Sequence, residues 1–390
     1  MPTLSPERSS LPSSMSLLTL YGLSFLFGVT VGIFNPLMST FMEQHQVSQL
    51  WIGATSTVYF LTIALVTPVV ERLLRKLGIR LILCLGCLFI MLSAPLFPLT
   101  SFLGLWFVIR IVMGFGVCAY LIGGQTALNL FCRDQNRASV SGLYFLAMGL
   151  GFIGGPAIGS YFYQISPSLA FLIGGGVIIT AMAMVWIFLP SSLRVKSGSR
   201  PAFFHLLKHF QFPIHGIFAY GMAEATLITL YPVFLLKQNY TVTQMGFALS
   251  IFVVGSLIST VPVTKIADKY GKVRILFICI CVGIIASIGL ITLTDYHLLL
   301  LFSGLAGASI GPVYPLCLAL VGEQVSQGDV GAGTALFTTT YSLGNATGPI
   351  LAAFLMESLG NSYIFSGFIP IYIVLLLRMM RGKLKAFKCN

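Results

Sequence analysis

Long apolar segments, separated by short polar ones, follow one another through the whole chain. Each is about 20 residues or longer, the length that an α-helix needs to cross a bilayer core of roughly 30 Å. The segments that we predict to span a membrane lie near 17–42, 50–71, 79–98, 102–126, 138–163, 168–190, 213–236, 243–264, 273–293, 297–321, 330–356 and 361–378. The pattern therefore predicts an all-α membrane protein with twelve transmembrane helices.

The scarcity of charged residues excludes a soluble globular protein. Of the 390 residues, 57% are hydrophobic and only 8% are Asp, Glu, Lys or Arg, whereas a soluble domain carries about 25% charged residues. The net charge of +12 does not indicate nucleic-acid binding, because the basic residues lie between the apolar segments and at their ends. We therefore expect the lipid bilayer, and no nucleic acid, as a partner.

The basic residues also orient the chain. Twelve spans place 20 of the 22 Lys and Arg residues on one face, leaving Lys237 alone on the other face and Arg110 inside a span. Because positively charged loops stay in the cytoplasm, we expect both termini and the polar loop at 191–212 to be cytoplasmic. The first apolar segment is too long for a cleaved signal and is predicted to be a retained span.

An internal repeat divides the chain into two halves. Glycines and one proline recur at a constant offset of 193 residues: Gly53 with Gly246, Gly78 with Gly271, Gly114 with Gly307, and Gly151, Gly155 and Pro156 with Gly344, Gly348 and Pro349. Transporters built from two parallel six-helix halves show such repeats and bind substrate near the midplane between the halves. We expect residues 1–190 and 213–390 to form two pseudo-symmetric six-helix bundles joined by the loop at 191–212.

The loop between spans 8 and 9 resembles the cytoplasmic loop motif of the major facilitator superfamily. Residues 264–274 read Thr-Lys-Ile-Ala-Asp-Lys-Tyr-Gly-Lys-Val-Arg, with Asp268 and Gly271 at the expected positions and Lys272 and Arg274 among the basic ones. In the family this Asp faces the N-terminus of a neighbouring helix, whose partial positive charge attracts it. The resemblance implies that the loop gates transport and that Asp268 latches the outward-open state.

The equivalent loop of the first half departs from the motif. In 71–80, Arg75 stands where the motif has Asp and Glu71 where it has its first Gly, so the resemblance implies no latch there. A subgroup of bacterial members is similar in this respect and also has a Tyr-Pro pair in span 10, as Tyr314 and Pro315 do here. The resemblance implies a bacterial inner-membrane protein.

Span 5 resembles the motif associated with drug/proton antiporters. It reads Gly-Phe-Ile-Gly-Gly-Pro-Ala-Ile-Gly over 151–159. Small residues four apart permit close helix contact, and a proline removes one backbone hydrogen bond and bends the helix. Helix packing alone would explain the motif equally well. The residues of this helix-bend motif and its second-half counterpart are Gly151, Gly155, Pro156, Gly159, Gly348 and Pro349.

Glu224 is the leading candidate for proton coupling. It lies midway along span 7 in Tyr-Gly-Met-Ala-Glu-Ala-Thr, where an ionised carboxylate costs about 3 kcal/mol on insertion scales. That cost falls if the carboxylate faces a wet cavity or is protonated part of the time, as coupling to protons requires. A structural Glu bonded to a neighbour, or a ligand for a cationic substrate, are the alternatives.

Arg110, in span 4, is the second candidate. It is the one cation predicted within a span. It can bind an anionic substrate, pair with Glu224 across the halves, or tie down carbonyl groups within its own half. Its segment from Arg110 to Gly116, Arg-Ile-Val-Met-Gly-Phe-Gly, resembles the family's span-4 motif, which implies a link to proton transfer.

A set of polar and aromatic residues on spans 1, 4, 7, 10 and 11 is predicted to line the substrate cavity. Several precede prolines, where helices bend and backbone groups can face a cavity. Each residue taken alone is also explained by helix packing. The set is Asn35, Gln125, Tyr231, Tyr314 and Asn345.

Together these features favour a secondary transporter with a small-molecule substrate and protons as its partners. We expect proton-coupled export of an amphipathic or drug-like compound, with uptake of an amino acid or carboxylate as the alternative and a transporter fold turned receptor or assembly protein as a third. The chain has no H-E-x-x-H or P-loop motif that would indicate a zinc metalloprotease or an ATP-driven pump. We expect no catalytic residue, metal, cofactor or obligate protein partner.

Overall fold

The computed structural model describes residues 14–131, 137–190, 211–324 and 330–387, and within these ranges it contains helices but no strand. The predicted loop at 191–212 and the chain termini fall almost wholly outside the described residues. The first half consists of α1 (Ser14–Gln44), α2 (Gln49–Leu77), α3 (Ile79–Ser93), the short 3-10 helix η1 (Ala94–Leu99), α4 (Leu103–Phe131), α5 (Arg137–Ile165) and α6 (Pro167–Phe188).

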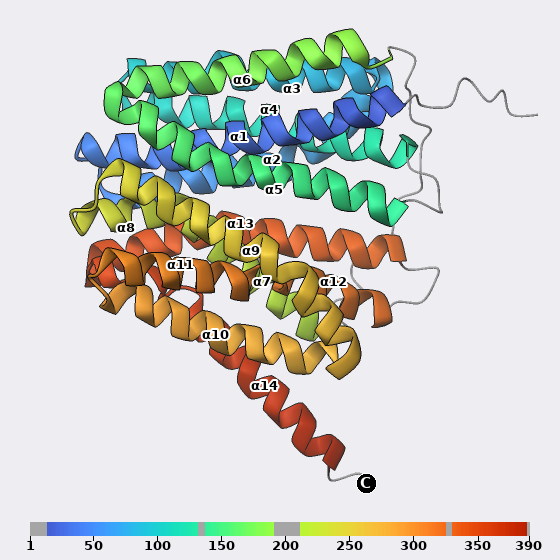
Figure 1. Ribbon diagram of the computed structural model, residues 1–390, viewed down its shortest axis with the longest axis vertical. Coiled ribbons are helices and arrows are strands. Elements are labelled where there is room, and N and C mark those ends of the chain that lie inside the picture. The colour runs from blue at the N-terminus through green and yellow to red at the C-terminus, as the bar shows by residue number, and fades with distance from the viewer. Residues whose placement is uncertain (1–13, 132–136, 191–210, 325–329, 388–390) are drawn as a thin grey trace, which may run out of the picture.

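The second half follows the same plan but has more broken helices. It consists of α7 (Gln211–Thr229), α8 (Tyr231–Lys237), α9 (Val242–Tyr270), α10 (Lys272–Thr292), α11 (Tyr296–Ile310), α12 (Val313–Gln324), α13 (Val330–Leu359), the 3-10 helix η3 (Asn361–Phe365) and α14 (Ile369–Phe387). In Figure 1 the two halves lie one above the other with most helices side by side, and α14 projects from the second half.

The helices account for twelve spans in the described part of the chain. Nine segments are long and apolar enough to cross a membrane, counting α11 and α12 as one, and the bent pair α7 and α8 is a tenth. The other two are α13, whose 30 residues include many Thr, Ser and Gly, and α14, with its apolar stretch Ile369–Met380. This confirms the predicted all-α membrane protein with twelve transmembrane helices.

Two spans of the second half are broken at prolines. The helices α7 and α8 meet at a bend of 46°, and Pro232 lies in the first turn of α8. In span 10 the chain breaks at Gly311 and Pro312, between α11 and α12. The break thus lies ahead of the Tyr314 and Pro315 pair that the sequence singled out, because a proline in the first turn of a helix is tolerated.

The two halves are related by the predicted repeat. The pair α1 and α5 corresponds to α7 and α13, and the pair α2 and α4 corresponds to α9 and α11; each pair packs together. Gly78 (φ 85°) separates α2 from α3, and Gly271 (φ 95°) separates α9 from α10. Both lie in the left-handed region that favours glycine, so the same sharp turn joins equivalent helices in each half.

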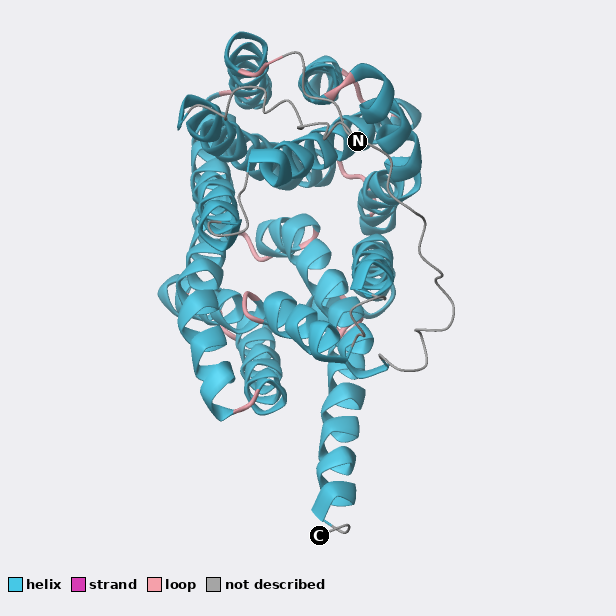
Figure 2. Ribbon diagram, turned by 90° about the vertical axis from the view of Figure 1, so that its right-hand side faces the viewer, coloured by secondary structure: helices cyan, strands magenta, loops and turns pink. Residues whose placement is uncertain are grey.

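The halves meet through two equivalent helix pairs, α2 with α13 and α5 with α9. Figure 2 shows the two bundles viewed approximately along the helices. A Cβ on Gly53 would lie 2.6 Å from the carbonyl oxygen of Pro349, and one on Gly246 would lie 2.6 Å from that of Pro156. Both distances are too short for any side chain, so these glycines permit the close packing of the halves.

Two polar contacts join the halves at the end away from the basic loops. Lys237 Nζ, at the end of α8, is 3.5 Å from Glu43 Oε1, at the end of α1. The backbone N–H of Leu50 donates a 2.8 Å hydrogen bond to Glu357 Oε2 on α13. Figure 1 shows α8 at one end of the molecule and the turn between α9 and α10, which carries basic residues, at the other. These contacts fasten the halves together at the end opposite that turn.

Candidate functional site

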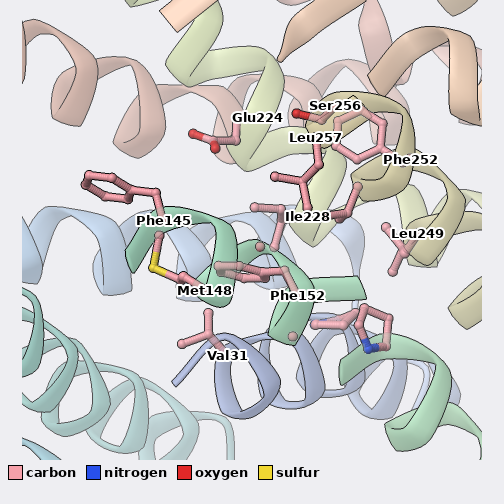
Figure 3. A pocket seen from close by; sticks show the side chains of 15 residues that line it. Val31, Phe145, Met148, Phe152, Glu224, Ile228, Leu249, Phe252, Ser256 and Leu257 are labelled. Atoms are coloured by element: carbon pink, nitrogen blue, oxygen red, sulfur yellow. The ribbon is translucent and has the colours of Figure 1, made fainter. Parts of the chain in front are cut away.

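A cavity of about 220 Å³ lies between the two halves, near the middle of the spans. It is formed by α1 and α5 from the first half and by α7 and α9 from the second. Figure 3 shows Glu224 on one side of the cavity and Phe145, Met148, Phe152 and Val31 on the other. Among the lining residues, Glu224 and Ser256 carry the polar side chains and the rest are apolar or glycine. The site is therefore an apolar chamber with one carboxylate.

The Glu224 carboxylate accepts a hydrogen bond on each oxygen. Tyr220 Oη, one helical turn earlier on α7, donates to Oε1 at 3.1 Å. Tyr341 Oη, on α13, donates to Oε2 at 2.5 Å. Hydrogen bonds to an ionised group are about twice as strong as those between neutral groups. Two neutral donors can therefore hold the carboxylate in place while leaving its charge uncompensated.

Three tyrosine rings pack together beside this carboxylate. The ring centroids of Tyr220 and Tyr314 are 5.7 Å apart, those of Tyr220 and Tyr341 are 5.9 Å apart, and those of Tyr314 and Tyr341 are 5.5 Å apart. These separations lie in the favourable range for aromatic pairs. The cluster joins α7, α12 and α13, so the position of Glu224 depends on three helices of the second half.

The polar site breaks the symmetry of the two halves. The 193-residue offset relates Glu224 to Val31, and both side chains line the cavity. The same offset relates Tyr341 to Met148, a further lining residue. The first half therefore fills these positions with apolar side chains. Since the fold tolerates apolar residues there, packing alone does not explain the carboxylate and its donor.

Arg110 belongs to a separate cluster inside the first half. Its side chain is 1% exposed, and Nη1 donates a 2.9 Å hydrogen bond to Asn35 Oδ1 on α1. Nη2 lies 3.5 Å from Ser56 Oγ on α2, and the guanidinium carbon is 5.5 Å from the centroid of the Tyr59 ring. In this geometry Arg110 contacts residues of its own half, and one of the contacts is with the side-chain carbonyl of Asn35.

The chain matches the family model described as Major Facilitator Superfamily twice, over residues 20–234 and 214–385. The chain belongs to this superfamily. Its members are transporters, so the protein is an integral membrane transporter of small molecules and not an enzyme.

Curated relatives of the superfamily match over most of the chain. An "Uncharacterized MFS-type transporter YfkF" of Bacillus subtilis is 26% identical over 345 residues, which cover 87% of this chain and 88% of the relative. A similar protein of Escherichia fergusonii, "Uncharacterized MFS-type transporter YcaD", is 23% identical over 94% of this chain and 95% of its own length. These relatives are bacterial, as the resemblance of the loops implied.

Solved superfamily structures share the fold. The crystal structure of the nucleoside transporter NupG matches with a TM-score of 0.76 and 15% identity, covering 95% of this chain and 99% of that structure. A bacterial homologue of the human lysosomal transporter Spinster, in an inward-facing and unoccupied conformation, matches with a TM-score of 0.74 and 14% identity over 95% of this chain and 98% of that structure. At this level of identity the match shows the fold alone.

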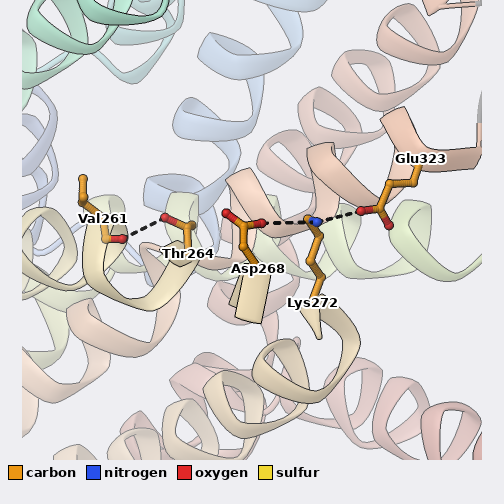
Figure 4. Close-up of polar contacts among 5 residues, drawn as sticks. All are labelled: Val261, Thr264, Asp268, Lys272 and Glu323. Carbon is orange, nitrogen blue, oxygen red and sulfur yellow. Dashed lines mark hydrogen bonds and ion pairs between the residues drawn. The ribbon is translucent and has the colours of Figure 1, made fainter. Parts of the chain in front are cut away.

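The cytoplasmic loop motif of the superfamily forms a chain of ion pairs in this structure. Lys272 Nζ lies 3.3 Å from Asp268 Oδ1 and 2.6 Å from Glu323 Oε1 at the end of α12, as Figure 4 shows. The Asp268 side chain is 70% exposed. Gly271 supplies the turn between them, and Arg274 follows in α10 as an exposed residue. In this conformation Asp268 is paired within its own half.

The helix-bend motif of span 5 packs against α1 of the first half, and the carbonyl of Pro156 also approaches Gly246 of the second half. A Cβ on Gly155 would lie 2.7 Å from the carbonyl oxygen of Val29 on α1, and Gly159 faces Ile33 and Leu37 of the same helix. In the second half Gly348 approaches α7 in the same way, 2.5 Å from the carbonyl oxygen of Met222. Close helix packing is thus visible for Gly151, Gly155, Pro156, Gly159, Gly348 and Pro349, and Pro156 also lines the cavity.

The five predicted lining residues lie elsewhere in the described structure. Asn35 binds Arg110, and Gln125 is exposed near the end of α4. Tyr231 is fully buried, with its hydroxyl 2.7 Å from Ser303 Oγ. Tyr314 belongs to the ring cluster, and Asn345 is buried on α13 one turn after Tyr341. The cavity itself is lined largely by residues that the sequence did not single out, from α5 and α9.

Tyr220 and Tyr341 are the functional candidates that the sequence reasoning missed. Tyr220 lies four residues before Glu224, a spacing that brings two side chains together on one helix face, so it could have been found. Tyr341 lies 117 residues away from Glu224. Only the packing of α13 against α7 reveals it.

Proposed function

We propose that this transporter exports amphipathic, positively charged compounds in exchange for protons. The observation that supports this proposal is the cavity between the halves, where Glu224 is the one ionisable side chain among the described lining residues and most of the others are apolar. An apolar chamber favours a hydrophobic body, and a carboxylate in low-dielectric surroundings attracts a cation strongly. The same carboxylate can release its proton when a cation replaces it.

The position of the site supports alternating access. The cavity lies between halves that are fastened by Glu43 with Lys237 and by Leu50 with Glu357 at one end. If the basic loops are cytoplasmic, as the positive-inside rule predicts, both termini are cytoplasmic and this conformation is closed toward the outside. The cavity would then be loaded from the cytoplasm or from the inner leaflet and emptied after the closed end opens.

Uptake of a carboxylate or amino acid is less well supported. That alternative needs a cation that binds the substrate, and Arg110 would supply it. Its guanidinium is instead directed at Asn35, Ser56 and Tyr59 within the first half. A cation so engaged would have to leave these partners before it could bind an anion.

Everted membrane vesicles test the choice of substrate. Vesicles containing the full chain are energised, and accumulation of tetraphenylphosphonium is compared with that of an uncharged compound of similar size. We expect accumulation of the cation alone, and its loss in Glu224→Gln vesicles. Glu71→Gln, which changes an exposed acid near the end of α2, is the matched control and should transport normally. Equal accumulation by Glu224→Gln vesicles would contradict the proposal.

A further inference from the structure

A second apolar groove lies on the outer surface of the first half, between α3 and α6. It encloses about 530 Å³, and Figure 1 shows both helices at the edge of the first half that faces away from the second. Its walls are apolar side chains within the membrane spans. The main lining residues are Leu81, Leu85, Leu88, Ile179, Met182 and Trp186. A groove at this depth, facing away from the other half, is in contact with lipid chains.

One end of the groove carries a cation held in a defined position. Arg80, in the first turn of α3, stacks its guanidinium carbon 4.3 Å above the ring of Trp186 on α6. Arg80 Nε is buried and has no hydrogen-bond partner in the described part of the chain. Arg72, Arg75 and Lys76 precede it in the last two turns of α2. The indole therefore fixes the planar guanidinium at this end of the groove.

The second half shows that the fold common to both halves does not require a cation at this position. The 193-residue offset relates Arg80 to Val273, and Trp186 to Met379. Val273 and Met379 line a groove between α10 and α14, but it encloses only about 90 Å³. The repeat thus places a groove at the same position in each half. The larger volume and the stacked Arg80 are found in the first half.

We propose that the groove between α3 and α6 is a binding site for an anionic phospholipid. One acyl chain lies along the leucines of α3, and the headgroup phosphate accepts hydrogen bonds from Arg80. Arginine is well suited to phosphate because its planar fork offers several donors in fixed geometry. Trp186 keeps that fork at the membrane interface, where tryptophan is enriched. The proposal does not depend on the substrate or direction of transport.

Tryptophan quenching by brominated lipids measures the occupancy of this groove directly. The chain has three tryptophans, of which Trp106 is 1% exposed and Trp51 is 48% exposed at the far end of α2. Trp51→Phe therefore leaves Trp186 as the tryptophan accessible to lipid. The protein is placed in bilayers that contain brominated phosphatidylglycerol or brominated phosphatidylcholine, each diluted in unbrominated phosphatidylcholine.

We expect phosphatidylglycerol to quench Trp186 with about fivefold higher apparent affinity, the effect of roughly one basic residue near a charged lipid. Arg80→Gln should abolish the preference, whereas Lys76→Gln, which changes an exposed charge in the last turn of α2, should retain it. Equal quenching by both lipids in the parent protein would overturn the proposal, and so would a preference that survives Arg80→Gln. Displacement of the lipid by soluble glycerol phosphate would also overturn it, because the site would then bind the free anion.

Discussion

Tyr341 on α13 donates a 2.5 Å hydrogen bond to Glu224 on α7. The same helix α13 packs against α2 of the other half, where Pro349 and Ala353 approach Gly53. One helix therefore touches both the cavity carboxylate and the interface between the halves. In the proposed exchange, loss of a proton from Glu224 or arrival of a cation there would act on the helix that has to move if the halves rock.

Replacing Tyr341 by Phe should destabilise the protein. The change keeps the ring and removes the donor to Glu224 Oε2, and a hydrogen bond to a charged group contributes about 1.5–3 kcal/mol. We expect a lower midpoint of thermal unfolding in detergent, measured as the loss of monodisperse protein on heating. Tyr314→Phe is the matched control, because its ring packs in the same cluster and no hydrogen bond of its hydroxyl is found among the described residues. Similar midpoints for the two variants would show that the Tyr341 donor contributes nothing.

Arg110→Lys should also destabilise the protein, because lysine keeps the charge but lacks the fork that reaches both Asn35 and Ser56. In a double-mutant cycle with Asn35→Ala, we expect a coupling energy of about 0.5–3 kcal/mol in thermal or chemical unfolding. A cycle without coupling, combined with loss of transport in a stable Arg110→Lys protein, would instead favour a role for Arg110 in substrate binding.

The ion pair of Lys237 with Glu43 should bias the conformational equilibrium. Its side chains are 38% and 18% exposed, and partly exposed pairs contribute about 0.2–1 kcal/mol, enough to change a population ratio up to about fivefold. Lys237→Glu should open this end of the molecule, and the double variant with Glu43→Lys should close it again. Distances between spin labels on the nearby ends of α2 and α13 report the change. If the double variant behaves like Lys237→Glu, the ion pair does not hold this end of the molecule closed.

Asp268→Asn tests the latch that the superfamily resemblance implies. In this structure Asp268 pairs with Lys272 in its own half, so the variant should keep the present conformation and lose the alternative one that the latch stabilises. Cysteine labelling should then increase on the face that carries the loop with Asp268 and decrease on the opposite face. The same labelling pattern in the parent and the variant would exclude a latch at Asp268.

The repeat explains how much of the fold is predictable from sequence. The apolar segments are long and the marker glycines recur at one offset, so the twelve spans and the pairing of Gly78 with Gly271 can be derived from the chain. The sequence points to Tyr314 and Pro315 in span 10, whereas the chain breaks earlier, at Gly311 and Pro312. Pro312 and Pro315 lie three residues apart in this span. Pro315 falls in the first turn of α12, where a proline is tolerated, so the break lies at Pro312 instead.

The site is less predictable than the fold. Glu224 stands out because a carboxylate within an apolar span is conspicuous. Tyr231 and Asn345 stand out by residue type and span number, which do not specify the helix face that a side chain occupies. Tyr231 points toward Ser303 in its own half. The lining residues from Phe145 to Phe152 cannot be predicted, because apolar residues in a membrane span carry no sequence signal that separates a cavity wall from a lipid-facing surface.

The central claim is that Glu224 exchanges a proton for a cationic substrate. Everted vesicles containing the full chain are energised, and a dye inside them reports acidification. Addition of a lipophilic cation should release protons from vesicles with the parent protein and from those with Glu71→Gln, but not from those with Glu224→Gln. Proton release of equal size from Glu224→Gln vesicles would contradict the account, and Glu224 would then have no part in coupling.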